Sequence, residues 1–322
     1  MKSFSKDILQ IKNLDEVCDE IIKKLKNDVA KKLHRRGAVI GISGGIDSSA
    51  CLALSAKAFG PENVTAIMLP EQDSSDDSRI LAEELAEKFN VTQILNENIT
   101  KALNGFGCYE RRDEAIGNVV KNFDPKVDKA KIEIKQNPAS TLPPIFSITV
   151  IKPDGEVISK LLPAKEYLQI VAATNFKQRS RMSMLYYHAE RLHYAVIGTP
   201  NKHEVEQGFF VKHGDGGADV MPIAHLYKTQ VYQIAKHLGV PKGILSRTPT
   251  TDTYTAEQTQ EDFFYQMPYE TMDLLWYGWE NGYTPEEVGK VMGKTTKEVE
   301  NIYKNMERKQ KTTEYLRMRP IF

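Results

Sequence analysis

The sequence of 322 residues is poor in cysteine, has no excess of charge of either sign and contains no long apolar run. Its three cysteines, Cys18, Cys51 and Cys108, lie far apart without zinc-ligand spacing, which argues against a disulfide framework and favours a reducing cytoplasm. Basic and acidic residues each number 43, so bulk electrostatic binding to nucleic acid or to an anionic membrane is not expected. No apolar segment reaches the ~18 residues of a membrane span, and the N-terminus lacks the apolar core of a signal peptide. We therefore expect a cytoplasmic protein with neither membrane nor nucleic-acid partners.

Two common nucleotide-binding signatures are also missing, although one stretch has the composition of a phosphate loop. Residues 39–50 read VIGISGGIDSSA, which contains neither the Gly-Lys-Ser/Thr of a Walker A loop nor the pattern G-x-G-x-x-G. The adjacent Gly44 and Gly45 follow an expected strand, 38–42, and precede an expected helix that begins at Asp47. Because glycine tolerates positive φ and has no Cβ, backbone N–H groups can approach an anion closely at the positive end of that helix. The stretch therefore predicts a phosphate site.

Short apolar segments alternate with helical patterns along most of the chain. This alternation predicts an α/β fold in which a parallel sheet is sandwiched between helices. Ligands bind such sheets at the carboxyl ends of the strands, where residues 43–47, 70–75 and 199–204 fall. The expected strands are 38–42, 64–69, 91–95 and 194–198, and the expected helices are 6–33, 47–59, 78–89 and 164–192.

Residues 105–163 break this alternation and look like an insertion. They contain an expected hairpin of strands 145–151 and 156–160, which turns at the sequence Pro-Asp-Gly, 153–155. The expected division of the chain is an N-terminal helix over 1–36, a main domain over 37–265 that includes the insertion, and a helical C-terminal extension over 266–322.

Beyond Thr284, two helical segments meet at Gly293. A DNA-binding helix-turn-helix is one interpretation, but a neutral chain without an obvious base-reading set favours a helical appendix that packs on the domain or on a partner. Trp276, Tyr277 and Trp279 could likewise cover a partner or complete the core, and their helical spacing favours the core for the tryptophans.

Three polar clusters follow the insertion. The first, 175–182, lies on an expected helix, where Lys177 and Arg181 are four residues apart and share a face. The second, 198–219, reads GTPNKHEVEQGFFVKHGDGGAD, and the third, 226–231, reads LYKTQV and opens a helix. Isolated charges on a helix are usually solvated surface residues, but these accompany a phosphate loop.

Residues 43–48, SGGIDS, resemble the pyrophosphate loop, S-G-G-x-D-S, of the ATP pyrophosphatases, which cleave ATP between its α and β phosphates. A simple Gly-Ser turn is the plainer interpretation, but five specified residues in a strand-turn-helix context seldom coincide. With its three clusters the chain resembles the ammonia-dependent NAD synthetases, whose motifs run N-x-K-x-R-x-R-M, G-T-x-N-x-x-E, G-x-F-x-K-x-G-D-G-x-x-D and L-x-K-x-Q-V. The matches extend from about residue 39 to residue 273, outside the insertion. The resemblance implies an adenine nucleotide α-hydrolase-like fold of three Rossmann-like layers.

The resemblance also implies ATP and Mg²⁺ as ligands and assigns roles to single residues. Asp47 and Glu204 would hold the metal, which agrees with the need for a hard cation between a carboxylate and phosphates. Asp47, Lys212 and Lys228 are the candidate catalytic residues. His203 and His213 have no metal-ligand companions, so we expect them to be pocket or surface polar groups. The candidate ATP-binding residues are Gly41, Ser43, Gly44, Gly45, Asp47, Ser48, Ser49, Arg179, Thr199, Lys228 and Thr250, and the candidate substrate-binding residues are Asn175, Lys177, Arg181, Lys212, Asp215 and Asp219.

The implied reaction has two steps, in which a small-molecule carboxylate is adenylated with release of pyrophosphate and ammonia then displaces AMP to form an amide. Water must be kept from the mixed anhydride, so residues 246–264 are expected to form a lid with Thr250 and Asp252 as contacts. No glutaminase domain is expected ahead of the loop, so free ammonia or a separate glutaminase must supply the nitrogen. Family members are typically homodimers.

The chain departs from the family pattern on the acceptor side. Pro200 and His203 replace a glycine and a serine of G-T-G-N-K-S-E, while Arg247 and Gln260 replace a lysine and an aspartate of the lid. The insertion also falls where a dinucleotide should bind. Three interpretations stay open at this point: an NAD synthetase that amidates deamido-NAD, a ligase of the same fold that adenylates another carboxylate such as a sugar acid, and a nucleotide-binding module without turnover.

Overall fold

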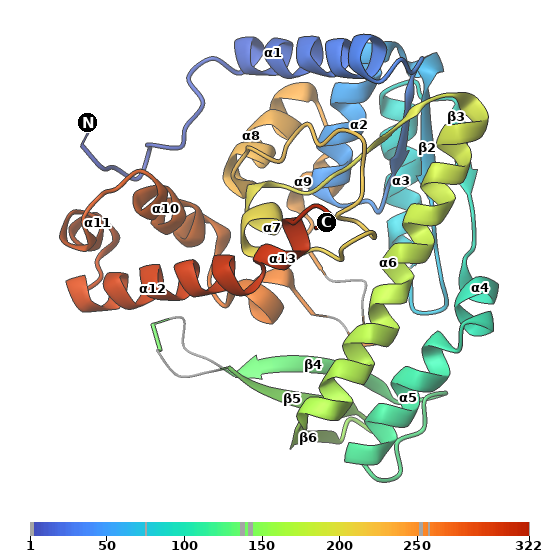
Figure 1. The fold of residues 1–322 in the computed structure, drawn as a ribbon, viewed down its shortest axis with the longest axis vertical. Helices are drawn as coiled ribbons and strands as arrows, with labels where there is room; N and C mark the ends of the chain where they lie inside the picture. Colours follow the sequence, from blue (N-terminus) through green and yellow to red (C-terminus); the bar gives the residue numbers. More distant parts are fainter. Residues whose placement is uncertain are drawn as a thin grey trace.

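The computed structural model describes residues 3–74, 76–135, 139–140, 144–250, 254–256 and 258–321. Figure 1 shows a parallel sheet between two layers of helices, an antiparallel sheet beyond one end of it, and a group of C-terminal helices at the side. The elements in chain order are α1 (Leu14–Asn27), the π-helix η1 (Asp28–Lys32), β1 (Ala38–Gly41), α2 (Ile46–Phe59), the 3₁₀ helix η2 (Pro61–Asn63), β2 (Val64–Met68), α3 (Asp76–Lys88), β3 (Gln93–Asn96), α4 (Thr100–Gly105), α5 (Cys108–Val119), β4 (Lys129–Lys135), β5 (Ile145–Ile151), β6 (Val157–Leu161), α6 (Ala164–Leu192), β7 (Ala195–Ile197), α7 (Lys202–Gln207), α8 (Lys228–Leu238), α9 (Lys242–Ser246), the π-helix η3 (Glu261–Tyr265), α10 (Tyr269–Glu280), α11 (Pro285–Met292), α12 (Thr296–Thr312) and α13 (Glu314–Arg317).

The main sheet has the strand order β3-β2-β1-β7, and all of its pairings are parallel. In register, Ala38 of β1 lies opposite Val64 of β2 on one side and Ala195 of β7 on the other. Strands β1, β2 and β7 are short and almost wholly buried, as expected of apolar strands that run through the centre of a covered sheet. The predicted parallel sheet is confirmed.

Successive residues of β1 face opposite helix layers. Ala38 and Ile40 belong to a core with buried residues of α1, α2 and α8, whereas Val39 packs with Met182 and Leu185 of α6. Because side chains alternate across a strand, a continuously apolar strand needs cover on both faces. The predicted three-layer α/β class is therefore confirmed.

The ends of several elements differ from their predicted positions. The predicted helix start at residue 6 is wrong, because α1 begins at Leu14, where the side chain of Asn13 accepts a hydrogen bond from the backbone N–H of Glu16. An asparagine in this position satisfies one of the unpaired N–H groups of a first helical turn and so sets the start of the helix. The third strand begins at Gln93, two residues later than predicted, whereas the long helix predicted over 164–192 is α6.

Helix α6 is the longest element and joins the main sheet to the second sheet (Figure 1). Ile170 in its first half packs with residues of α5, β4 and β5, and Met182 and Leu185 in its second half cover the main sheet. Within the described ranges, no helix combines the length and the apolar character that crossing a bilayer demands.

The region predicted as an insertion contains a three-stranded antiparallel sheet of order β4-β5-β6. The predicted hairpin is confirmed as β5 and β6, and Gly155 at its turn has a φ of 90°, a conformation that favours glycine. Strand β4 was not predicted from the sequence. Its residues alternate, since Ala130 and Ile132 are buried while Lys131 and Glu133 are partly exposed and form an ion pair.

Part of the predicted lid is docked on this second sheet. Tyr254 is buried in the apolar cluster that α5, β4, β5 and α6 share. The backbone N–H of Ala130 donates to Oγ1 of Thr255 at 2.7 Å, and the N–H of Ala256 donates to the carbonyl of Ala130 at 3.2 Å. The lid and the second sheet therefore share backbone and core contacts, while the predicted lid contact Asp252 lies outside the described residues.

The C-terminal helices form their own apolar core, to which the first residues of the chain contribute. The two helices predicted beyond Thr284 are α11 and α12, and Gly293 between them has a φ of 66°. Trp276 is 1% exposed and lies at the centre of this core, where its ring meets that of Trp279 at 4.9 Å and 75°. Phe4 of the N-terminal segment packs in the same core. The core interpretation of the tryptophans is confirmed, although Trp279 is only partly buried.

Replacing Leu54 of α2 by alanine should lower the free energy of unfolding by about 2–5 kcal/mol, because its side chain is fully buried against the sheet and leaves a cavity. Leu168→Ala is the matched control, since Leu168 also lies on a helix but is 63% exposed, and its loss should stay below about 1 kcal/mol. Urea unfolding of both variants measures the difference, and equal losses would contradict the packing described here.

Candidate active site

The site lies at the carboxyl ends of β1 and β7. These strands are neighbours in the sheet, with Ile40 opposite Ile197, although β2, β3 and the second sheet separate them in the chain. The chain runs from β1 through β2 to β3 on one side of β1 and later returns to form β7 on the other side, and such a switch point leaves a crevice between the loops that follow β1 and β7. Residues 43–48 and residues 199–204 therefore meet at one edge.

The glycine loop leaves the start of α2 open. Gly44 has a φ of 71°, and a Cβ there would lie 3.1 Å from both Cβ of Leu81 and the carbonyl oxygen of Ser78. Gly45 precedes α2 without a side chain that caps the helix, while Ser43 Oγ accepts a hydrogen bond from the N–H of Gly45 at 3.3 Å. Unpaired N–H groups at a helix start carry partial positive charge and bind anions. The predicted phosphate loop thus has the geometry that phosphate binding requires.

Two side chains from other elements hold Asp47. Lys228, the fully buried first residue of α8, donates from Nζ to Oδ2 of Asp47, and Nδ2 of Asn201 donates to its Oδ1 at 3.3 Å. Burial is the largest single influence on Lys228 and opposes its positive charge, but the negative charges of Asp47 and Glu204, together with the hydrogen bond to Asp47, outweigh it, so the pKa of Lys228 is raised. The ion pair therefore joins α2 to α8 directly beneath the glycine loop.

Glu204 lies in the first turn of α7 and forms a capping box with Asn201. Oε2 of Glu204 accepts from the N–H of Asn201 at 2.9 Å, and Oδ1 of Asn201 accepts from the N–H of Glu204 at 3.3 Å. Burial, and after it the negative charge of Asp47, raises the pKa of Glu204 to about 8. The site thus places two carboxylates close enough that one resists ionisation.

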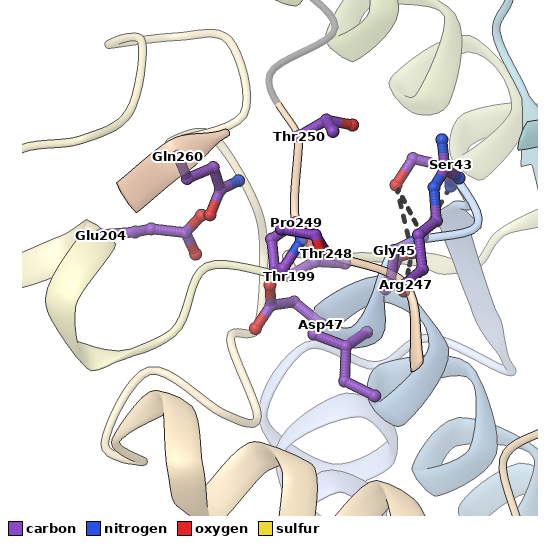
Figure 2. A pocket seen from close by; sticks show the side chains of 12 residues that line it. Ser43, Gly45, Asp47, Thr199, Glu204, Arg247, Thr248, Pro249, Thr250 and Gln260 are labelled. Atoms are coloured by element: carbon purple, nitrogen blue, oxygen red, sulfur yellow. Dashed lines mark hydrogen bonds between the residues drawn. The ribbon is translucent and has the colours of Figure 1, made fainter. Parts of the chain in front are cut away.

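A pocket between the glycine loop and the predicted lid gathers these groups. Figure 2 shows Ser43, Gly45 and Arg247 on one side of it and Glu204 and Gln260 on the other. The complete lining is Ser43, Gly45, Ile46, Asp47, Ser48, Thr199, Glu204, Arg247, Thr248, Pro249, Thr250 and Gln260. Seven of the predicted site residues, Ser43, Gly45, Asp47, Ser48, Thr199, Glu204 and Thr250, therefore lie around one cavity.

Other predicted residues of the loop lie behind the pocket. Gly41 is at the end of β1, where a Cβ would meet Leu185 at 3.4 Å. Ser49 is fully buried, and its Oγ donates to the carbonyl of Gly45 at 2.7 Å. Neither residue lines the cavity, so their ATP-binding roles stay predictions.

Lys177, a predicted substrate residue, is neutralised by two carboxylates. It is 1% exposed, and its Nζ donates to Oε1 of Glu71 at 3.0 Å and to Oδ2 of Asp73 at 2.6 Å. Arg112 of α5 also pairs with Asp73, and the hydroxyl of Tyr109 donates to Oε2 of Glu71 at 2.6 Å. Breaking a buried pair would leave an uncompensated charge, so these groups hold α6, α5 and the loop after β2 together.

Arg179, Arg181 and Lys212, the other predicted site cations of the first two clusters, also lie outside the pocket lining. Nε of Arg181 donates to the carbonyl of Leu69 at 3.1 Å, and Nε of Arg179 donates to the carbonyl of Lys212 at 3.2 Å. The ammonium of Lys212 donates to the carbonyl of Tyr315 at 2.8 Å. The C-terminal segment therefore meets the predicted substrate-binding loop through Lys212.

Asp215 and Asp219 shape that loop. Oδ1 of Asp215 accepts from the N–H of Val211 at 2.7 Å, and burial raises the pKa of Asp215 to about 6. Oδ2 of Asp219 accepts from the N–H of Val196 at 2.8 Å, which ties the loop to β7. Asn175 is half-buried on α6. The substrate roles of all three side chains stay predictions.

His203 is not a pocket or surface group, and that prediction is wrong for it. Its ring is fully buried between Oδ1 of Asp273, 2.6 Å from Nε2, and the side-chain amide of Gln207, 3.2 Å from Nδ1. Oδ2 of Asp273 accepts from the N–H and the hydroxyl of Thr229 at 2.8 Å and 2.6 Å. His203 thus joins α7, α8 and α10 and supports Glu204 from behind, whereas His213 is exposed as expected.

The donor set of the pocket suits a hard divalent cation. Carboxylate oxygens of Asp47 and Glu204 are its acidic groups, and the raised pKa of Glu204 reflects negative charge that a cation would compensate. In the described part of the chain, no three or more histidine, cysteine or acidic side chains gather as a complete metal cage. Mg²⁺ ordinarily uses one or two protein carboxylates and completes its shell with water and phosphate oxygens, so the two residues fit it.

The motifs did not assign several residues of the pocket lining, or Asn201, which contacts both carboxylates of the pocket. Arg247 and Gln260 were noted as departures from a motif but not assigned to the site, and Asn201 was passed over. The signal for Asn201 was available, because an asparagine three residues before a glutamate marks a helix start. Arg247 and Gln260 gave no comparable signal, since only the folded lid brings them into the lining of the pocket.

A family model described as NAD synthase matches residues 17–127 and 125–315 of the chain. The ammonia-dependent NAD synthetase of Rhizobium rhizogenes is 46% identical over 319 residues, which cover 99% of this chain and 95% of that relative. The ammonia-dependent NAD synthetase of Rhizobium meliloti is 45% identical over 317 residues, covering 98% and 94% of the two chains.

Solved structures share the fold at lower identity. The NMN synthetase from Francisella tularensis superposes with a TM-score of 0.63 at 24% identity, covering 96% of this chain and 98% of that one. The ammonia-dependent NAD synthetase from Campylobacter jejuni superposes with a TM-score of 0.62 at 19% identity, covering 96% and 99%. At these identities the likeness concerns the fold alone.

The raised pKa of Glu204 predicts a pH-dependent stability in metal-free protein. The folded carboxyl keeps its proton up to a pH of about 8, whereas the unfolded chain releases it near the ordinary value, so rising pH between these limits favours unfolding. Between pH 5 and 8, wild-type protein in EDTA should lose about 1 kcal/mol or more of unfolding free energy relative to Glu204→Gln. Urea unfolding at several pH values measures this, with Glu206→Gln of the same helix as the control. Parallel wild-type and Glu204→Gln curves would contradict the burial of this charge.

Proposed function

This chain belongs to the NAD synthase family and is an ammonia-dependent carbon–nitrogen ligase, and we propose that the pocket at residues 43–48 is where it activates deamido-NAD with ATP. NAD synthetase was one of three interpretations of the sequence. Relatives at 45–46% identity over nearly the whole chain confirm it and do not favour an enzyme that acts on another carboxylate.

The observation that carries the proposed site is the position of Asp47 and Glu204 beside the uncapped start of α2. The N–H groups of that start attract phosphate, whereas the two carboxylates repel it unless a cation lies between them. N–H groups that attract phosphate beside carboxylates that repel it are expected where a nucleotide binds together with a metal ion. A turn that only joins a strand to a helix does not need this combination.

In the first step the residues of the pocket would orient ATP for attack on its α-phosphorus. The carboxylate of deamido-NAD forms a bond to that phosphorus, and the bond between the α-phosphorus and the bridging oxygen breaks, so pyrophosphate leaves with its electron pair. Backbone N–H groups of residues 43–48 and the serine hydroxyls of the loop would hold the departing pyrophosphate. Lys228 keeps the Asp47 side chain oriented through its buried ion pair.

Asp47 and Glu204 are the residues that would hold Mg²⁺. When bound, the metal would neutralise negative charge on the phosphates as the bond to pyrophosphate breaks. The carboxamide and backbone N–H of Asn201 contact Asp47 and Glu204 respectively, so Asn201 would keep the two carboxylates in place.

In the second step ammonia attacks the carbonyl carbon of the acyl-adenylate. AMP leaves, the nitrogen loses a proton, and the product is the amide. The lid residues Thr248, Pro249 and Thr250 line the pocket together with Gly45 and would exclude water from the mixed anhydride (Figure 2). Exclusion of water matters because hydrolysis would return the starting acid and waste the ATP.

Several finer assignments belong to the same proposal. We infer homodimer formation, delivery of ammonia either free or by a separate glutaminase, and residence in the cytoplasm, which the three buried free thiols support. The division into 1–36, 37–265 and 266–322, and the substrate roles of Asn175, Lys177, Arg181, Lys212, Asp215 and Asp219, likewise remain predictions.

The reaction itself is tested by supplying the full chain with ATP, Mg²⁺, ammonium and deamido-NAD and separating the products by anion-exchange chromatography. We expect NAD, AMP and pyrophosphate in equal amounts. Omission of ammonium should abolish NAD formation. Absence of NAD with all substrates present would refute the proposed function.

Glu204→Gln and Asp47→Asn should each lower turnover by roughly 10²-fold or more, because each removes a proposed metal carboxylate. The two variants should differ in stability. Glu204→Gln relieves a charge that resists burial and should unfold no more easily than wild type at pH 8, whereas Asp47→Asn leaves the buried Lys228 without its partner and should be destabilised by about 3 kcal/mol or more.

Asp154→Asn, in the hairpin turn far from the pocket, is the control and should keep wild-type activity. Turnover assays and urea unfolding check both effects. Wild-type turnover by Glu204→Gln at ordinary Mg²⁺ concentrations would exclude its role as a metal carboxylate.

A further inference from the structure

Arg247 is a cation of the pocket that the reaction described above does not use. It lies in the lid between α9 and Thr250 and lines the cavity together with Ser43 and Gly45. Figure 2 shows it on the glycine-loop side, across the pocket from Glu204. Arg247 therefore lies next to the loop that would hold pyrophosphate and not next to Glu204.

The guanidinium of Arg247 is close to the loop backbone. Its Nη1 lies 3.3 Å from the point that a Cβ on Gly44 would occupy. A bulkier residue at position 44 would thus push against the arginine as well as against Leu81, and the positive φ of Gly44 turns the loop toward it. The arginine and the open start of α2 face the same small volume.

A neutral group holds Arg247 in this place. Both Nη1 and Nη2 donate to Oγ of Ser78, at 3.3 Å and 3.2 Å, and no carboxylate among the side chains that the structure describes, which leave out Asp76 and Asp77, forms an ion pair with it. Lys228, the other cation of the site, is bound to Asp47. Arg247 is therefore a cation of the pocket whose charge no described carboxylate neutralises.

The chemistry of the first step needs such a group. When the bond to the α-phosphorus breaks, negative charge accumulates on the pyrophosphate, and a planar guanidinium can bind two phosphate oxygens at once. A cation aimed at the place where charge develops stabilises the transition state more than the ground state.

We propose that Arg247 binds the β and γ phosphates of ATP and stabilises the departing pyrophosphate, with Ser78 as the residue that positions it. This inference rests on the proposed function of the pocket. The inference also connects catalysis to the position of the lid, because the side chain that would bind pyrophosphate is the one that bonds the lid to Ser78 of α3.

Three variants of Arg247 separate its charge from its role as a tether. Arg247→Gln keeps a donor for Ser78 but removes the charge, Arg247→Lys keeps the charge but not the planar fork, and Arg247→Ala removes both. Arg79→Ala is the control, because Arg79 is an exposed residue of the same helix that carries Ser78 and pairs with Glu83.

The first measurement is calorimetric titration of the full chain with inorganic pyrophosphate and Mg²⁺. We expect Arg247→Gln and Arg247→Ala to bind pyrophosphate at least 30-fold more weakly than wild type, Arg247→Lys to lie between them and wild type, and Arg79→Ala to match wild type. The second measurement is NAD formation, where kcat/KM for ATP should fall in the same order while inhibition by AMP stays within twofold of wild type.

Wild-type pyrophosphate affinity in Arg247→Gln would overturn the inference and leave Arg247 as a tether of the lid. Equal loss of AMP and pyrophosphate binding in Arg247→Gln would also overturn it, because that pattern indicates a disordered pocket. Failure of wild-type protein to form NAD would refute the proposed function instead, so the two failures are distinguishable.

Discussion

The proposed active site depends on one buried ion pair, between Lys228 at the start of α8 and Asp47 at the start of α2. A lysine with no exposed surface is tolerated only if a negative charge is fixed beside it, and this requirement brings the two helix starts together. Asn201 then spans from Asp47 to Glu204, so the tip of β7 is fixed to the tip of β1. Lys228 pairs directly with Asp47, whereas burial and the neighbouring charge of Asp47 raise the pKa of Glu204, so a cation bound between the two carboxylates would offset the cost of ionising Glu204.

A second set of buried charges places the second sheet relative to the first. Lys177 of α6 and Arg112 of α5 share Asp73, and Lys177 also binds Glu71, so both helices are fastened to the loop that follows β2. Tyr254 of the lid is in turn buried in the core of that second sheet. The lid is thereby attached at Tyr254 to the second sheet and at Arg247 to α3, and the pocket lies between the two attachments. This arrangement connects the region 105–163 to the segment that borders the pocket.

The family-like motifs of the sequence contain two physically different kinds of residue. Ser43, Gly45, Asp47, Thr199 and Glu204 line the pocket, as the motifs predicted. Other residues in or next to these motifs instead contact the protein itself, and they are Lys177, Asp219 and His203. A motif records which residue types must stand at fixed spacings, but it does not record whether a side chain faces a ligand or a neighbouring helix. The substitution that brought His203 into the chain illustrates this, since its partner Asp273 is seventy residues away.

The sequence by itself determined the parallel sheet, the long helix α6 and the glycine loop, because apolar periodicity and glycine conformations are local properties of the chain. It also determined the family, since the ordered polar motifs can be recognised in the sequence without knowledge of the fold. Only the tertiary structure decided which charges are consumed in buried pairs and which remain to act on a ligand. That outcome depends on distances between residues far apart in the chain, such as Asp47 and Lys228 or Gly44 and Arg247, and such distances exist only after the chain has folded.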